Sequence, residues 1–404
     1  MGARKHANLA NYAIGNIIKH RSKTAAIIIA LAMSTSLLCS IEFIRQGVTQ
    51  DLSLSLDEGP DITVQKLVGG RQAPCPTSWR DNLTEYSGVE DVLPRVWGYA
   101  DVGSGKLLTI MGIDPVEYEE TPGAVGTDII GEGSFLPQND THKLIVGQGI
   151  LDLMQRSMTS VSLGVGSQIS LIAYDNSLIP FEIVGIFSSE SKIYSYDLLM
   201  TDIQSAREVL GVANDSCTDI AVWTSPGYNT NSIALQMDNT FPEARILSKS
   251  AMRDMGLRAY SVRAGIVALL WAVLLLVVVL LAFTVSSSGS DEARREVGLL
   301  KALGFDTVDV LEIRMFENLI LGLLGCSTGI SFAIVYDYFL GAPLLSEFVL
   351  GWSTSLLVGG MPLVVSPSTI FTAYAVGIVP ILVASVIPAW RNAITEPDIV
   401  LRGV

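Results

Sequence analysis

Four long apolar runs interrupt an otherwise mixed pattern of hydrophobic and polar positions. The first three, residues 24–41, 264–290 and 318–336, contain 18, 27 and 19 residues without a single charge. The region 348–390 is also uncharged, but Gly and Pro residues break its first half, so we place the fourth run at 368–390. Because a membrane-spanning helix needs about 20 predominantly apolar residues, the pattern predicts four transmembrane helices.

The region between the first two runs, residues 47–262, has a different pattern. The segments "GSQISLIAY" and "IPFEIVGIF" alternate hydrophobic and polar positions with a period of two, which predicts a pair of strands. The segment "DIQSAREVLG" predicts a helix that Asp202 caps and Gly211 ends. The sequence therefore predicts an α+β domain inserted between helices 1 and 2, with an inserted subdomain at about 80–190.

Charge is distributed unevenly along the chain and indicates an orientation. Residues 1–23 carry five basic side chains and no acidic one, whereas residues 50–258 carry 28 Asp and Glu against 13 Lys and Arg. Basic flanks favour the cytoplasmic side. We therefore expect a multi-pass protein of the cytoplasmic (inner) membrane, with both termini in the cytoplasm and the large domain outside. The acidic surplus argues against nucleic-acid binding.

The candidate chemistry of the polar residues is sparse. No CxxC or Cys/His cluster is present, no hydrolase or metalloprotease motif occurs, and no G-x-x-x-x-G-K-[ST] phosphate loop is found. We therefore predict no catalytic, cofactor or metal site. Cys75 and Cys217 both fall in the predicted outer domain, where a disulfide could form. The sequence leaves open whether they pair or remain free thiols.

One charged stretch, "SGSDEARREVGLLKALGF", connects the second and third apolar runs. It predicts a helix at Asp291–Leu303, with Ser290 as its N-cap and Gly304 just after its end. Gly298 and Ala302 lie four residues apart and would leave a shallow notch for another backbone. Glycine within a helix costs about 1 kcal/mol relative to alanine, and a docked partner would be a reason for it. An amphipathic helix that lies on the inner leaflet is the alternative.

The segment "EARREVGLLKALGF" resembles the R-R-x-[EI]-G-L-L-[RK]-A-[LI]-G motif of FtsX-like ABC transporter permeases, the MacB and lipoprotein-release (type VII ABC) group. The N-terminal stretch "ANYAIGNIIKHRSKTAAIIIALAMSTSLL" is similar to the basic helix and first span of that family. The C-terminus resembles the family's tail at Pro388, Ala389, Arg391, Pro397, Leu401 and Arg402. Trp390, Asn392 and the "GFDT" that follows the motif depart from the family pattern.

This resemblance implies a permease subunit without its own ATP-binding motifs, so that ATP and Mg²⁺ would be bound by a separate cytoplasmic ABC ATPase dimer. It implies a second permease copy, as a homodimer or a related heterodimer, and a periplasmic adaptor or outer-membrane exporter as a further partner class. The charged helix resembles the family's coupling helix, which seats in the ATPase. The residues concerned are Arg294, Arg295, Glu296, Gly298, Leu299, Lys301, Ala302 and Gly304.

The implied function is mechanotransmission, in which ATPase movements drive export or extraction of a hydrophobic substrate (lipoprotein, lipid, toxin or drug). Two alternatives remain: an FtsX-type scaffold that passes the ATPase state to an outer partner, and a membrane sensor without an ATPase. Glu317, at the start of the third run, is a candidate for a structural ion pair with Arg294 or Arg295.

The expected organisation follows from these patterns. It comprises an N-terminal amphipathic helix (1–23), helix 1 with a stalk (24–46), the outer domain (47–262), helix 2 (263–290), the coupling helix (291–304), helix 3 (305–339), an outer loop (340–367), helix 4 (368–390) and a cytoplasmic tail (391–404), with the FtsX-like permease domain at 263–396.

Overall fold

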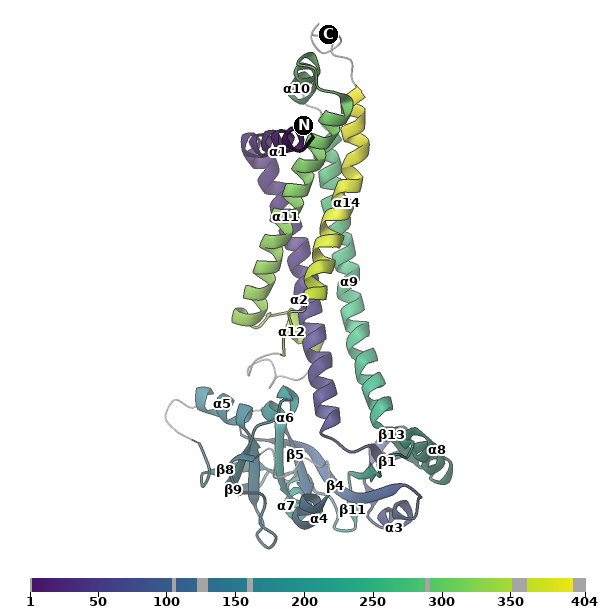
Figure 1. The fold of residues 1–404 in the computed structure, drawn as a ribbon. Coiled ribbons are helices and arrows are strands. Elements are labelled where there is room, and N and C mark those ends of the chain that lie inside the picture. The colour runs from purple at the N-terminus through teal and green to yellow at the C-terminus, as the bar shows by residue number, and fades with distance from the viewer. Residues whose placement is uncertain are drawn as a thin grey trace. The chain divides into compact units, whose positions relative to one another are not determined.

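The computed structural model describes residues 2–103, 107–121, 130–157, 163–287, 291–350 and 362–394. The chain forms two compact units. The first, here the helical unit, comprises residues 1–46, 262–345 and 363–404, and the second, here the sheet unit, comprises 47–261 and 346–362. Figure 1 shows the helices of the first unit and the sheet of the second.

Long helices make up the helical unit. Their bounds are α1 (Gly2–Lys19), α2 (Arg21–Asp57), α9 (Lys249–Ser287), α10 (Asp291–Ala302), α11 (Thr307–Leu340) and α14 (Pro367–Ile394). The short helix α12 (Leu345–Leu350) belongs, from residue 346 on, to the sheet unit. Within the described residues, α2, α9, α11 and α14 are long and apolar enough to cross a membrane. The last residues of α2 and the first residues of α9 belong to the sheet unit.

Small residues allow α2, α11 and α14 to approach closely. A Cβ atom added to Gly329 of α11 would lie 2.7 Å from the backbone oxygen of Ala32, and one added to Gly325 would lie 2.6 Å from Leu31. On α14, a Cβ at Gly377 would lie 2.5 Å from the sulfur of Cys326. Glycines at such contacts are typical of membrane helices, because close backbone packing there replaces the missing hydrophobic driving force.

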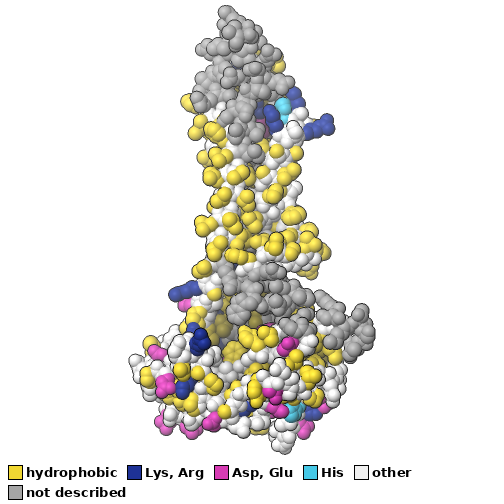
Figure 2. Space-filling model, turned by 180° about the vertical axis from the view of Figure 1, so that it is seen from behind, with side chains coloured by type: hydrophobic (Ala, Val, Ile, Leu, Met, Phe, Trp, Pro, Cys, Tyr) yellow, Lys and Arg dark blue, Asp and Glu magenta, His cyan; other side chains and the backbone are white. Residues whose placement is uncertain are grey.

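The outer faces of these helices are hydrophobic. Figure 2 shows many hydrophobic side chains along the described part of the helical unit. On α9 the exposed side chains include Leu269, Leu270, Val273, Leu276, Val277 and Leu280. A continuous apolar surface of this extent is unfavourable in water, and it fits a lipid or protein surrounding.

One large mixed sheet forms the sheet unit. Its described strands are β1 (Ile62–Val68), β2 (Arg71–Ala73), β4 (Val89–Asp101), β5 (Leu107–Ile113), β6 (Ile130–Gly133), β7 (Lys143–Gly147), β8 (Gln168–Ile172), β9 (Leu178–Phe187), β10 (Leu198–Asp202), β12 (Asp219–Thr224) and β13 (Ala244–Ser248). The main order is β13-β1-β12-β4-β5-β10-β7-β9-β6, with β2 beside β1 and β8 beside β4 and β9. The short strands β3 (Cys75–Pro76) and β11 (Ser216–Cys217) form a separate pair.

Shorter helices flank this sheet. They are α3 (Trp79–Thr84), α4 (Pro115–Glu120), α5 (Gln148–Ser157), α6 (Lys192–Asp197), α7 (Ile203–Leu210) and α8 (Thr230–Thr240). Strands β5 and β10 run parallel, as do β7 and β9, and the other pairs are antiparallel. The 13-residue strand β4 pairs with β12 along its first part and with β5 along its second. The segment predicted as an insertion, 80–190, therefore continues the same sheet through β4.

Several local predictions for this unit are confirmed. Strands β8 and β9 are antiparallel neighbours, as their alternating pattern predicts. The Asp202 side chain accepts a hydrogen bond from the backbone N–H of Ser205, and Gly211 ends α7 with a positive φ of 68°. Helix α9 begins at Lys249, well before the predicted start of helix 2 at 263. The prediction began at the apolar run and missed the first turns, because they are polar and carry no membrane pattern.

Candidate functional site

Helix α10, the predicted coupling helix, packs against α1, α11 and α14 of the helical unit. Its Leu300 is buried in a cluster with Leu9 and Ala13 of α1 and Ile313 of α11. Val297 is buried as well, against Val310. Gly304 has a φ of +90°, and the backbone N–H of Phe305 donates to the carbonyl of Leu300 at 3.1 Å. These features end the helix as its sequence predicts.

The exposed face of α10 differs from the predicted one. Gly298 is buried, so it does not lie on the open face where the prediction placed a notch, and that part of the prediction is wrong. Leu299, 60% exposed, lies on the open face together with Ala302 and Leu303. Lys301 is half-buried and Gly304 is exposed. The side chains of Arg294, Arg295 and Glu296, like the N-cap Ser290, lie outside the described part of the structure.

Helix α1 is attached to the start of α11 by two polar contacts. The Lys5 ammonium lies 2.7 Å from the Asp309 carboxylate, and this hydrogen bond raises the pKa of Lys5. One turn further along α11, Glu312 pairs with His6. The α1 prediction covered only its amphipathic character. Its partners stand some 300 positions away in the sequence, so no local pattern identifies them.

Glu317 forms an ion pair with Arg314, while the side chains of the predicted partners Arg294 and Arg295 lie outside the described residues. The Arg314 guanidinium lies 2.7 Å from one carboxylate oxygen of Glu317, and the Asn16 amide donates to the other at 2.8 Å. Glu317 is thus satisfied by one turn of α11 and by α1. The contact fixes α1 on α11, and an additional pair of Glu317 with Arg294 or Arg295 stays a prediction.

Another carboxylate, that of Asp337, lies buried near the end of α11. The Ser40 hydroxyl of α2 donates to one of its oxygens, and the other oxygen has no hydrogen-bond partner among the described residues. A buried acidic group in a membrane helix is costly, so this pair marks a position where α2 and α11 must keep their register.

The end of α2 is held inside the sheet unit by two acidic side chains. The Asp51 carboxylate accepts hydrogen bonds from the backbone N–H groups of Lys192 (2.7 Å) and Ile193 (2.9 Å), at the start of α6. Glu58 accepts the hydroxyl of Ser189 at 2.8 Å. Asp51 is 4% exposed, so its negative charge is directed at the N-terminus of α6, where backbone dipoles favour it.

The same end of α2 contacts the first turns of α9. Arg253 lies 2.8 Å from Asp57, and a Cβ atom added to Gly256 would lie 2.3 Å from a methyl carbon of Leu52. Burial raises the pKa of Glu58, which lies just after α2. The Arg253 and Gly256 contacts join α2 to α9, two helices that are distant in sequence. Glu58 in turn joins the end of α2 to the loop at Ser189.

A buried ion pair lies between β4 and β12. Arg95 and Asp219 stand directly opposite in the register, and the guanidinium donates two hydrogen bonds to the carboxylate at 3.0 and 2.9 Å. The Trp97 indole donates a third at 2.9 Å. A bidentate pair with its remaining lone pairs engaged can be accommodated in a core. Its role is structural, and the 124 positions between its partners conceal it from sequence reading.

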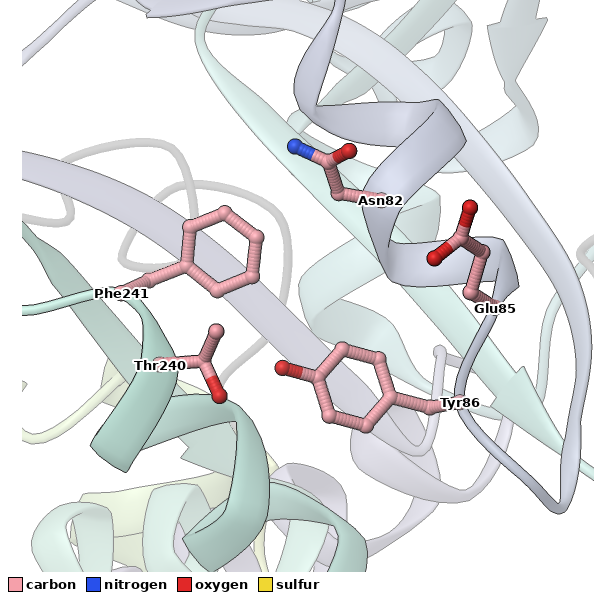
Figure 3. Close-up of a pocket in the computed structure, with 5 residues that line it drawn as sticks. All are labelled: Asn82, Glu85, Tyr86, Thr240 and Phe241. Carbon is pink, nitrogen blue, oxygen red and sulfur yellow. The ribbon is translucent and has the colours of Figure 1, made fainter.

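A cleft of about 510 Å³ lies at the ends of α3 and α8. Figure 3 shows its lining residues, with Asn82, Glu85 and Tyr86 on one side and Thr240 and Phe241 on the other. The Phe241 ring lies 5.4 Å from that of Trp79, centroid to centroid. The cleft combines aromatic surface with one carboxylate and is open to solvent, and it contains no paired nucleophile and base. Among the described residues, no cluster of three or more His, Cys, Asp or Glu is arranged to hold a metal ion.

The apolar helices together with the sheet unit define a membrane permease with an extracytoplasmic domain, and two family profiles match the chain accordingly. The MacB-like periplasmic core domain matches residues 24–240, and the FtsX-like permease C-terminal region matches residues 268–397. The first match alone covers more than half of the chain. The chain therefore belongs to the FtsX-like, MacB-like family of ABC transporter permeases. Permeases of this family work with an ATPase partner.

Two solved structures are similar to part of this chain. The periplasmic region of MacB from Actinobacillus actinomycetemcomitans has 15% identity and a TM-score of 0.33, over 48% of this chain and 91% of its own. The extracellular domain of the noncanonic ABC-type transporter YknZ from Gram-positive bacteria has 11% identity and a TM-score of 0.33, over 46% of this chain and 99% of its own. No curated protein matches the chain.

Proposed function

We propose that this chain is the mechanotransmitting permease subunit of an ABC exporter, driven by a separate cytoplasmic ATPase dimer that binds ATP and Mg²⁺. The substrate is hydrophobic (a lipoprotein, lipid, toxin or drug) and is extracted or exported on the outer side of the cytoplasmic membrane. Four spans, cytoplasmic termini and a second permease copy complete the proposal. The observation that carries it is the attachment of α2 to the sheet unit through Asp51.

The cytoplasmic step would use the open face of α10. Leu299, Ala302 and Leu303 project an apolar surface away from the rest of the helical unit. The opposite face is anchored by Val297 and Leu300. A force applied by an ATPase to the open face would therefore be passed to α1 and α11 rather than absorbed by a loose helix.

The outer step would use α2 as a lever. The helix is continuous over 37 residues, and a continuous hydrogen-bonded helix resists bending more than a loop does. Its end holds α6 through the Asp51 carboxylate, and Glu58 holds the preceding loop. A displacement of α2 along its axis would then move the strands β7 and β10 beside α6, without any passage of substrate through the helices.

The test is co-purification of the tagged chain from its native membranes in mild detergent, with an assay of ATP hydrolysis. We expect an ABC ATPase to be recovered with the wild-type chain. We expect Leu299→Asp to abolish this recovery, because a charge would be buried in the docking surface. Leu235→Asp is the matched control, since Leu235 is 65% exposed on α8, and it should leave recovery unchanged.

Two outcomes would contradict the proposal at different levels. A wild-type preparation without any ATPase would refute the driven permease and favour a sensor. Equal recovery with Leu299→Asp would retain the permease but refute the assignment of the α10 docking face. An ATPase that co-purifies while no hydrophobic substrate is exported would favour the scaffold function.

A further inference from the structure

Two cysteines of the sheet unit face each other across a short ladder. Cys75 lies on β3 and Cys217 on β11, directly opposite in the antiparallel register. Their sulfur atoms are 3.2 Å apart, and both residues are fully buried. They are separated by 142 positions in the sequence, so only the fold brings them together.

The backbone at this position has the geometry that a disulfide requires. Opposed residues of an antiparallel pair have Cα atoms about 4.5–5.5 Å apart, within the range of about 4.4–6.8 Å that disulfides span. The two thiols share a hydrogen bond, which lowers the pKa of Cys75. The same bond, together with burial, raises the pKa of Cys217.

We propose that Cys75 and Cys217 are joined by a disulfide in the mature protein. The bond forms by exchange with a protein or small-molecule disulfide of the extracytoplasmic compartment during folding, before the thiols are buried. One thiolate attacks the donor disulfide and releases one donor thiol; the second thiolate then displaces the other. The cysteines lose two protons and two electrons in total, and the donor is reduced to two thiols.

The bond has a defined structural consequence. Residues 75 and 217 bracket strands β4 to β10 and helices α3 to α7, and they lie in the same buried cluster as Ile62, Val222 and Met237. A covalent bond here closes the segment at its base and removes chain freedom from the unfolded state. The sheet unit can then be displaced as one body without separating β3 from β11.

The chain offers its own control cysteines. Cys39 and Cys326 are buried in the helical unit. They lie in the apolar helices α2 and α11, in clusters that do not contain Cys75 or Cys217. Variants at the four positions can therefore show which pair of cysteines undergoes a redox change.

The test counts free thiols in the full chain, alkylated in denaturant directly from native membranes and measured by intact mass. We expect two labels without reductant and four after reduction, with a peptide pair that links Cys75 to Cys217 in a non-reducing digest. Cys75→Ser and Cys217→Ser should each give three labels without reductant. Cys39→Ser should give one before reduction and three after. Four labels in the unreduced wild type would overturn the proposal.

A second measurement follows stability. Reduction should lower the melting temperature of the wild-type sheet unit by about 5–15 °C, and it should leave the Cys75→Ser, Cys217→Ser double variant unchanged. An equal response of the wild type and the double variant would also overturn the proposal, because the reductant would then act elsewhere.

The inference rests on the proposed function in placing the sheet unit outside the cytoplasm, and one variant separates the two. All four natural cysteines are buried, so Leu235→Cys adds a single exposed thiol. Its labelling by a membrane-impermeant maleimide on spheroplasts would establish the outer location. Labelling of Leu235→Cys together with four free thiols in the unreduced wild type refutes the disulfide alone. Absence of labelling refutes the proposed topology, while the wild-type thiol count still decides the disulfide.

Discussion

Replacement of Asp51 by alanine tests the connection between α2 and the sheet unit. The change removes the acceptor of two backbone N–H groups, those of Lys192 and Ile193. Hydrogen bonds to a charged group contribute about 1.5–3 kcal/mol each, but the cost of burying this carboxylate offsets part of that gain. Loss of a capping side chain costs about 0.5–2 kcal/mol. We therefore expect a loss of about 2 kcal/mol in the free energy of unfolding of the sheet unit.

The assay measures stability and coupling in the same preparation. For a unit of this size 1 kcal/mol corresponds to about 2–4 °C, so thermal unfolding followed by tryptophan fluorescence should shift down by about 4–8 °C. In membranes reconstituted with the ATPase, substrate export should fall much more than ATP hydrolysis, because α2 would move without carrying α6.

The controls use the same helix. Asp57→Ala removes a surface ion pair with Arg253, which contributes at most about 1 kcal/mol, and it should leave export intact. Asp51→Asn keeps one acceptor oxygen and should have an intermediate effect. An Asp51→Ala protein that exports as well as Asp57→Ala does, at equal expression, would refute the lever.

Three further results are expected. Gly147→Ala should destabilise the sheet unit by about 1–3 kcal/mol, because the new Cβ would lie 2.2 Å from the carbonyl oxygen of Ser195. Gly329→Leu should lower the melting temperature of the helical unit, because its side chain would displace the α2 backbone. Burial raises the pKa values of Glu58 and Asp197, so the folded state binds protons more tightly than the unfolded state, and stability should rise as the pH falls from about 7 to about 5.

Each of these expectations has its own control. Gly164 has open space around its Cα, so Gly164→Ala should be nearly neutral, and an equal loss there would contradict the Gly147 argument. Gly265 has open space as well, and Gly265→Leu should leave the helical unit folded. The pH dependence should flatten in a Glu58→Gln, Asp197→Asn double variant, and persistence of the full slope would assign it to other groups.

Local patterns determined most of the elements. Alternation with a period of two identified β8 and β9. The side chain of Asp202 and the left-handed backbone of Gly211 fixed the ends of α7. Apolar runs identified the long helices, because a membrane-spanning helix requires a continuous hydrophobic stretch that can be recognised in the sequence. The motif around Arg294 and Arg295 identified the family, because it is a contiguous sequence signal that needs no tertiary information.

Local patterns could not show which side of α10 is open. Val297 and Leu300 are buried whereas Leu299 is exposed, although all three are equally apolar in the sequence. A broad hydrophobic arc fits several orientations, and only the positions of α1 and α11 select one. The predicted notch at Gly298 failed for this reason.

Contacts between distant residues were decided by the tertiary structure alone. Asp51 reads as one more charge in an acidic stretch until α6 is brought beside it, and Arg95 and Asp219 meet only in the β4–β12 register. The two cysteines could be proposed as a pair from their compartment, but their proximity follows from the β3–β11 ladder. The sequence by itself determined the elements and the family, whereas pairing energies between distant side chains depend on the three-dimensional arrangement that all the elements reach together.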